Sequence, residues 1–314
     1  MISMKIKPLF LFIILCSCTA LFSQTKLDTV VAQKGDGIFS ILRKSGIHPV
    51  KYYVDFLDLN KDSIKGASEL MVGRKYVLPN APDSFKNMGT FIHVDEVGEV
   101  PLFDVDLLKM KQRDSTLKNT VYYLIQTDNK TEDNQAQTQN EFTAKLSKDL
   151  MERGARVYVL QKSITTLDNN NEEGDAENAI ADFGELTSIV NKKYLMHNGS
   201  YQRLLMIRDA KSNKKEISIT MHHYDKNADG LRLAESFRDI FKKNAIGIIK
   251  TDQGISPFTD QLSVYLAKNL LPSVTIMDIN GSQEGISLRF GKFTLSELIT
   301  KGILQDHTNL NFTD

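Results

Sequence analysis

Two adjacent histidines, His222 and His223, stand at the end of a strand-like stretch and could do metal or acid–base chemistry. From residue 217 to residue 222 apolar and polar side chains alternate, which is the period-two pattern of a β-strand. If this strand is central in an α/β sheet, its carboxyl end lies where such sheets place their sites. The alternative is a polar strand end whose imidazoles meet water or backbone, and the pattern alone leaves both interpretations open.

The elements that position these histidines belong to a chain of 314 residues, a length that suggests about two domains. The hydrophobic fraction of 41% is enough for real cores, and the charged fraction of 25% is ordinary. Lysine plus arginine equals aspartate plus glutamate at 39 each. Because the chain has no overall basic field, nucleic acid is not an expected partner.

Residues 1–23 have the pattern of a secretory signal peptide. Lys5 and Lys7 precede a short apolar run at 9–15, and small residues follow up to a cleavage site expected just before Gln24. The run is too short for a stable membrane span, and no later run approaches about 18 apolar residues, so no transmembrane helix is expected. We therefore expect export to the periplasm or cell envelope.

The only two cysteines, Cys16 and Cys18, lie inside this leader. Cleavage before Gln24 leaves a mature chain without thiols, which suits an oxidising envelope compartment. The alternative is a lipoprotein anchored at Cys18. In either case no disulfide and no cysteine metal site is expected in the folded part.

Residues 28–79 predict a small β-α-α-β module. A β-like run at 29–32 is followed by a helical pattern that Gly46 closes. Pro49 opens a second helical segment, with the apolar face Val50, Tyr53, Val54 and Leu57. The last strand ends at Pro79.

This module resembles a LysM domain. The resemblance is carried by Val31, Lys34-Gly35-Asp36, Ile38, Ser40-Ile41, Gly46, Leu59-Asn60 and the run from Val72 to Pro79. It implies binding of N-acetylglucosamine-containing glycans, usually peptidoglycan, and the matching glycan-binding residues are Gly35, Asp36, Gly37, Ile38, Leu59 and Asn60. Gly37 stands where the family usually has threonine or serine, which removes a hydroxyl and loosens the turn. The alternative is a LysM fold kept as a spacer or as a protein-docking module.

A linker with short strand-like pieces is expected at 80–117, a second domain at 118–305 and a tail at 306–314. The second domain opens on the continuous apolar run Val121 to Ile125, as expected for a strand buried on both faces. A helical pattern through Phe142 ends at Gly154, and strands and helices go on alternating to a closing helix at 294–303. This order predicts an α/β fold with a mostly parallel sheet flanked by helices.

The second domain resembles the zinc-dependent N-acetylmuramoyl-L-alanine amidases, and with the module before it the LysM-plus-amidase envelope proteins of Bacteroidetes-type bacteria. The matching segments are 117–124, 140–143 with Leu150, 154–157, 201–203, 209–212, the two histidines ahead of Leu233-Ala234, 272–274 and 298–302. The resemblance implies a zinc ion held by His, Glu and His, with a second Glu activating the zinc-bound water.

The chemical positions of that family are largely absent from this chain. Only Glu141 matches a zinc ligand. Residues 126–130, where the first histidine is expected, contain neither histidine nor glycine, and Ile207-Arg208 stands in place of the second histidine. The catalytic glutamate falls on Met277, with Asp278 beside it.

Two interpretations remain. In the first, the amidase-like domain is a pseudoenzyme that needs no cofactor and serves as a binding or regulatory scaffold, with another envelope protein as a candidate partner. In the second, Asp128, Glu141 and His222 rebuild a zinc site with Asp278 as base, and the chain is a divergent amidase that cleaves peptidoglycan. The first is favoured, because a shift of one residue along a strand turns a side chain to the opposite face and makes Asp278 a poor substitute at 277.

Overall fold

The computed structural model describes residues 27–64, 69–94, 98–128, 133–163, 173–210, 218–244, 254–280, 289–290 and 292–310. The expected leader, both cysteines and residues 311–314 lie outside these ranges. The chain divides into two compact units: unit 1 is Met1–Leu42 with Pro49–Ala81, and unit 2 is Arg43–His48 with Pro82–Asp314. Within the part of the chain that is described, no helix combines the length and apolar character needed to cross a membrane.

Unit 1 has the predicted order strand, helix, helix, strand. Strand β1 (Thr29–Val31) pairs antiparallel with β2 (Lys75–Val77), and the helices are α2 (Ile38–Lys44) and α3 (Tyr53–Leu59). Its core is built from Ile38, Ile41, Leu42, Tyr52, Phe56 and Tyr76.

The buried side of α3 differs from the predicted one. Val50 and Val54 are 70% and 63% exposed, whereas Tyr52 and Phe56 are buried. Both pairs are spaced four residues apart, so the helical period fits either face. The larger aromatic side chains bury more apolar surface, and they take the core side.

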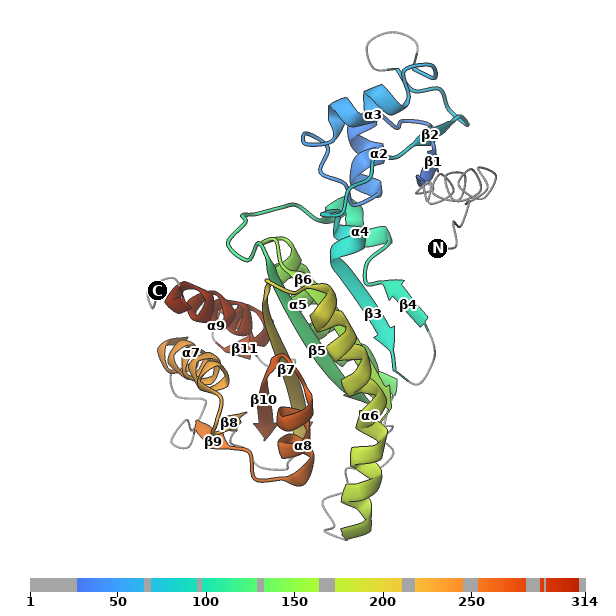
Figure 1. Ribbon diagram of the computed structural model, residues 1–314. Coiled ribbons are helices and arrows are strands. Elements are labelled where there is room, and N and C mark those ends of the chain that lie inside the picture. The colour runs from blue at the N-terminus through green and yellow to red at the C-terminus, as the bar shows by residue number, and fades with distance from the viewer. Residues whose placement is uncertain are drawn as a thin grey trace, which may run out of the picture. The chain divides into compact units, whose positions relative to one another are not determined.

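Unit 2 is built on an eight-stranded sheet in the order β4-β3-β6-β5-β7-β10-β8-β9 (Figure 1). The strands are β3 (Gly89–His93), β4 (Gly98–Pro101), β5 (Thr120–Asp128), β6 (Arg156–Ser163), β7 (Tyr201–Ala210), β8 (Ser218–His223), β9 (Ile255–Pro257) and β10 (Ser273–Asn280). The five neighbours β3, β6, β5, β7 and β10 run parallel. Strands β4 and β8 are antiparallel to β3 and β10, and β9 is parallel to β8. The predicted mostly parallel sheet is confirmed.

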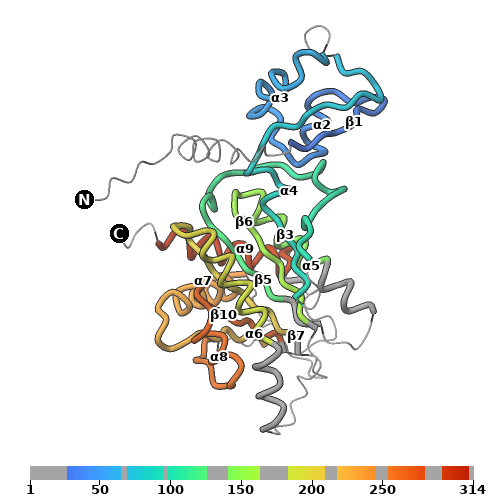
Figure 2. Tube along the Cα trace, turned by 45° about the vertical axis from the view of Figure 1, so that its right-hand side comes forward, coloured from blue at the N-terminus to red at the C-terminus, as the bar shows by residue number. Residues whose placement is uncertain are grey.

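Helices cover both faces of this sheet. Helices α5 (Asp133–Met151), α7 (Ala228–Asn244) and α9 (Leu295–Leu310) pack on one face, with α7 and α9 side by side (Figure 1 and Figure 2). Helices α6 (Glu173–Met196) and α8 (Gln261–Asn269) pack on the other face. Smaller elements are α4 (Phe85–Met88), the 3-10 helix η2 (Val105–Lys109) and a hairpin of β11 (Arg289–Phe290) with β12 (Phe293–Thr294).

Two predicted boundaries and the predicted place of one strand differ from the structure. The expected linker at 80–117 contributes β3 and β4 to the large sheet, and unit 2 resumes at Pro82. Helix α9 continues to Leu310, through residues assigned to the tail. Strand β8 is antiparallel and next to the edge strand β9, so its histidines do not end a central parallel strand.

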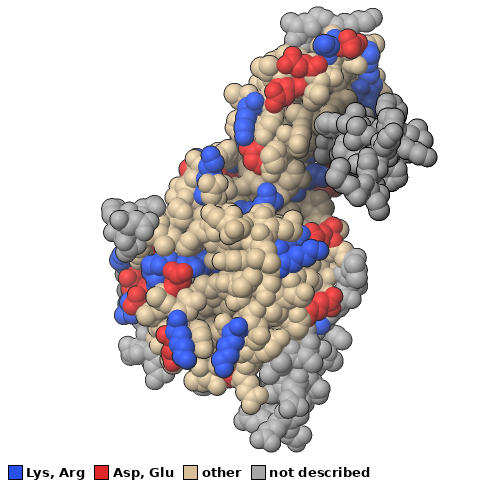
Figure 3. All heavy atoms as spheres, in the orientation of Figure 1, with Lys and Arg blue, Asp and Glu red and all other residues tan. Residues whose placement is uncertain are grey.

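Opposite charges are interspersed on the surface. Figure 3 shows lysine and arginine side chains near aspartate and glutamate side chains over the face in view. Lys193 pairs with Glu99 at 2.7 Å, and Arg113 pairs with Glu152 at 2.7 Å and with Asp149 at 3.3 Å. This mixture agrees with the equal totals of basic and acidic residues in the sequence.

Candidate functional site

Four neighbouring strands each contribute one polar residue to a continuous row on the sheet. The row runs Arg208 on β7, Asp278 on β10, His222 on β8 and Ser256 on β9. Arg208 stands directly opposite Asp278, and His222 stands directly opposite Ser256. His222 is in register with Ile276, so Asp278 is its diagonal neighbour, within reach of a long side chain. We call these residues the four-strand row.

Hydrogen bonds join every member of the row to the next. Arg208 Nε and Nη2 donate to the two oxygens of Asp278 at 2.6 and 2.9 Å. His222 Nε2 lies 3.0 Å from Asp278 Oδ2, and His222 Nδ1 lies 2.7 Å from Ser256 Oγ. The side chains of Arg208, His222 and Asp278 are 25%, 20% and 20% exposed, so solvent reaches the row.

Electrostatics keep the carboxyl group of Asp278 ionised. Burial by itself raises the pKa of Asp278. Hydrogen bonds from His222 and Arg208, with the positive charge of Arg208, outweigh burial and lower the pKa below its usual value. An ionised carboxylate only accepts hydrogen bonds, so the His222 nitrogen that faces it must carry a proton.

The row lies toward the carboxyl ends of β7 and β10, on the face covered by α6 and α8. Its neighbours along these strands, Met206 and Ile276, belong to the core on that face. Ile207 and Met277 point to the opposite core, and Met277 is fully buried there. The side chains of residues 277 and 278 therefore point to opposite faces of the sheet, as predicted.

Of the sequence-predicted zinc ligands, Glu141 and His222 lie on opposite sides of the sheet. Glu141 is an exposed residue of α5, a helix that packs on the face opposite the row. His222 is bonded to Asp278 and Ser256 within the row. Asp128 ends β5, and its side chain lies outside the described residues. Among the residues that are described, no group of three or more His, Cys, Asp or Glu is placed to hold a metal ion.

His223, the second histidine of the pair, does not belong to the row. His223 is buried on the α5/α7/α9 face, with Nδ1 3.2 Å from the Tyr224 carbonyl oxygen.

Ser256 was not predicted from the sequence. It is the middle residue of the three-residue strand β9, which ends at Pro257, and neither length nor alternation marks so short a strand.

The predicted glycan-binding residues of unit 1 divide into surface and core positions. Gly35, Gly37 and Leu59 are exposed. Asp36 accepts hydrogen bonds from Gln33 N and Ser40 Oγ, both at 2.9 Å, and so holds the turn ahead of α2.

Ile38 and Asn60, also predicted to bind glycan, are buried within the module. The Asn60 amide nitrogen donates to the carbonyl oxygens of Phe56 and Val77 at 2.8 Å, and Val77 N donates to Asn60 Oδ1 at 2.7 Å. Asn60 therefore joins the end of α3 to β2, leaving Gly35, Gly37 and Leu59 at the surface.

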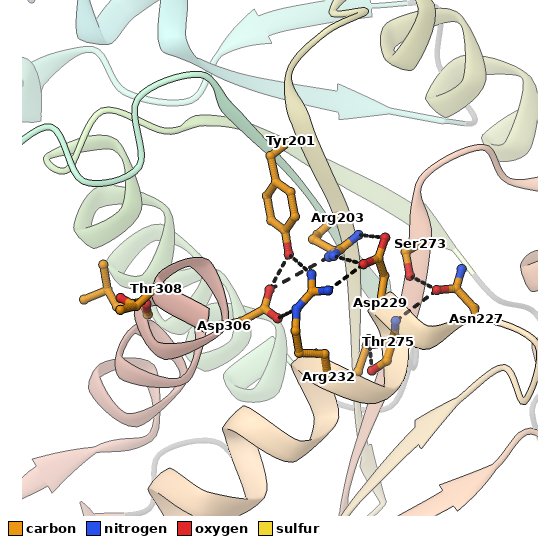
Figure 4. Close-up of polar contacts among 11 residues, drawn as sticks. Tyr201, Arg203, Asn227, Asp229, Arg232, Ser273, Thr275, Asp306 and Thr308 are labelled. Carbon is orange, nitrogen blue, oxygen red and sulfur yellow. Dashed lines mark hydrogen bonds and ion pairs between the residues drawn. The ribbon is translucent and has the colours of Figure 1, made fainter. Parts of the chain in front are cut away.

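A second polar cluster lies at the other end of β7 and on its other face (Figure 4). Arg232 Nε donates to Asp306 at 2.9 Å and Arg232 Nη1 to Asp229 at 2.7 Å, while Arg203 Nη1 donates to Asp229 at 3.2 Å. The Tyr201 hydroxyl also donates to Asp306. Burial raises the pKa of Tyr201. The two arginines balance the two aspartates, so this cluster joins α7 and α9 to the start of β7.

Comparison with solved structures finds distant similarities. The catalytic domain of the CD27L endolysin targeting Clostridia difficile is 14% identical, with a TM-score of 0.37 over 60% of this chain and 97% of that one. The CwlD amidase from Clostridioides difficile, in complex with the GerS lipoprotein, is 12% identical, with a TM-score of 0.40 over 62% and 99%. The N-acetylmuramyl-L-alanine amidase Ami1 from Mycobacterium smegmatis is 12% identical, with a TM-score of 0.37 over 63% and 99%.

No protein-family model matches the sequence, and no curated protein matches it either. At identities of 12–14% and TM-scores of 0.37–0.40 the similarity to solved structures assigns no activity to this chain. The proposals below are therefore argued from its own residues.

Proposed function

We propose that this chain is an exported cell-envelope protein that binds peptidoglycan through residues 28–79 and carries an amidase-like domain without zinc-dependent activity. The observation that carries the proposal is the bidentate pair of Arg208 and Asp278. Sequence resemblance calls for a zinc-binding histidine at Ile207-Arg208 and for a catalytic glutamate at Met277. None of Ile207, Arg208 and Met277 offers a zinc ligand or a base, and Arg208 binds the neighbouring Asp278 in an ion pair. In this proposal the domain is a binding or regulatory scaffold.

Peptidoglycan binding is proposed for unit 1 on the resemblance of its residues to a LysM domain. Its β-α-α-β order is that of the proposed module. The exposed turn at Gly35 and Gly37 offers backbone groups to a sugar, and the exposed Leu59 offers an apolar contact. Asp36 holds the turn in one conformation, which reduces the ordering cost of binding.

The test is to incubate the full chain with isolated peptidoglycan sacculi. We expect the protein to sediment with the sacculi and to release no peptides. Leu59→Asp should greatly reduce sedimentation, because a charge replaces the apolar contact. Val54→Asp is the matched control: Val54 is also exposed on α3 but is not a predicted glycan-binding residue.

Failure of the unaltered chain to sediment would contradict peptidoglycan binding. Equal loss in both variants would exclude the predicted glycan surface. Release of peptides from the sacculi that a metal chelator abolishes would contradict the proposed absence of zinc-dependent amidase activity.

A further inference from the structure

We infer that Ser256 is an activated nucleophilic serine that accepts an acyl group from carboxylic esters, with His222 as the proton acceptor. This goes beyond the proposed function, because serine chemistry requires neither zinc nor glycan binding. The observation is the continuous hydrogen-bonded row Asp278–His222–Ser256, with links of 3.0 and 2.7 Å. A serine bonded to an imidazole that a carboxylate orients is the arrangement that activates serine nucleophiles.

The direction of each hydrogen bond follows from the acceptor-only nature of the carboxylate. Ionised Asp278 must receive a hydrogen from His222 Nε2. In the neutral imidazole Nδ1 then carries the lone pair, so the Ser256 hydroxyl donates its proton to it. Asp278 therefore fixes the tautomer that leaves His222 able to take the serine proton.

Arg208 and Asp278 act as positioning residues. The two hydrogen bonds from Arg208 fix the plane of the Asp278 carboxylate and offset its charge. Compared with the serine proteases, the two ring nitrogens exchange roles, since the carboxylate faces Nε2 and the serine faces Nδ1. Either nitrogen of a neutral imidazole can accept a proton, so the chemistry is preserved.

The reaction is an ordinary acyl transfer. Ser256 Oγ attacks the ester carbonyl carbon while its proton passes to His222 Nδ1. The bond from that carbon to the leaving alkoxide breaks, and the alkoxide takes the proton from His222 to leave as the alcohol. Water then attacks the acyl carbon while one of its protons passes to His222. The bond from that carbon to Ser256 Oγ breaks, Oγ takes the proton back from His222, and the carboxylic acid leaves. Ser256 is itself partly exposed, as are His222 and Asp278, so solvent reaches all three residues.

The test is labelling of the full chain with a fluorophosphonate probe, followed by mapping of the modified peptide. We expect modification at Ser256. Ser256→Ala should abolish it, and Ser218→Ala on β8 should leave it unchanged. His222→Gln keeps a side chain able to hydrogen bond but unable to accept a proton, so it should lower the labelling rate at least tenfold while the thermal unfolding midpoint is retained. Hydrolysis of p-nitrophenyl acetate should fall in parallel.

Three outcomes would overturn the inference. One is no labelling of Ser256 above that of a heat-unfolded sample. Another is an unchanged labelling rate in His222→Gln. The third concerns Ser256→Cys, a variant that keeps the inference testable if Ser256→Ala fails to fold. We expect its thiol to react with iodoacetamide faster than free cysteine does. Equal reactivity of the introduced thiol and of free cysteine would contradict activation at this position.

Discussion

Arg208, near the end of β7, holds Asp278 of the neighbouring strand β10 through two hydrogen bonds of 2.6 and 2.9 Å. The two residues stand directly opposite each other in a parallel ladder, so their side chains project from the same face. A guanidinium and a carboxylate in this fork arrangement satisfy each other. The polar residues nearest to the expected catalytic positions thus form an internal ion pair.

Removing Arg208 should leave the partly buried Asp278 carboxylate without two of its hydrogen bonds and without the guanidinium charge. We expect Arg208→Ala to lower the free energy of unfolding by about 1–3 kcal/mol at pH 7. Arg238→Ala is the control, because Arg238 pairs with Glu235 and Asp239 at the surface, and its loss should cost less than about 1 kcal/mol. Urea unfolding measures both values. Equal costs in the two variants would contradict the role given to Arg208.

The same pair predicts a pH dependence. The pKa of Asp278 is lowered in the folded state, so its contribution to stability is present above the unfolded pKa, near 3.8, and is lost as the pH falls through the folded value. The difference in unfolding free energy between the unaltered chain and Arg208→Ala should therefore be constant near neutral pH and shrink in acid. A difference that grows as the pH falls below 4 would show that the ion pair is not its source.

A hydroxyl at position 37 should strengthen glycan binding. A Cβ built on Gly37 meets no atom within 4 Å, and its backbone is not in the left-handed region, so threonine fits there. We expect Gly37→Thr to raise sedimentation with sacculi at unchanged stability. Gly35→Thr is the contrast, because φ at Gly35 is +90° and a β-branched side chain is strained there. No gain from Gly37→Thr would mean that the missing hydroxyl does not limit binding.

Asn60 should matter for folding. Asn60→Ala removes two hydrogen-bond donors and one acceptor from backbone groups of Phe56 and Val77, of which the Phe56 bond is buried and the Val77 bonds are partly buried. The expected cost is about 3 kcal/mol of unfolding free energy, from the backbone groups left unsatisfied. Asp58→Ala, at an exposed position of the same helix, should change stability by less than about 0.5 kcal/mol. Amide hydrogen exchange of β2 would report the loss locally, and unchanged protection in Asn60→Ala would contradict this role.

Substitution of Asp306 should lower the free energy of unfolding by a similar amount. Asp306→Asn leaves the Arg203 and Arg232 side chains with one carboxylate, Asp229, between them. We expect a loss of about 3 kcal/mol, because a buried charge remains uncompensated. Thr308→Ala, on the exposed side of the same helix, should be nearly neutral. Thermal unfolding distinguishes the two, and a neutral Asp306→Asn would contradict a structural role for the cluster.

Much of the layered fold was predictable from local sequence. The run Val121 to Ile125 is continuous and apolar, and it forms part of β5 between two parallel neighbours with both faces covered. The alternation at 217–222 also predicted a strand, but not its place. Ile219 and Met221 face one core while Thr220 and His222 face the other side, a pattern typical of a strand outside the parallel centre.

The four-strand row could not have been assembled from the sequence. Its members are separated by up to 70 residues along the chain and are brought together by strand order and register. Both depend on tertiary packing of several elements at once. The sequence did predict that Met277 and Asp278 point to opposite faces of the sheet, because this depends only on the two-residue period of a strand.

Zinc content of the purified full chain, measured by elemental analysis, tests the central claim most directly. Glu141 and His222 belong to opposite sides of the sheet, and His222 is bonded within the row, so a three-ligand centre is not assembled from the described residues. We predict less than about one zinc per ten molecules after exposure to zinc and desalting. One zinc per molecule, lost in both Glu141→Ala and His222→Ala together with cleavage of sacculi, would contradict the account and establish a zinc amidase.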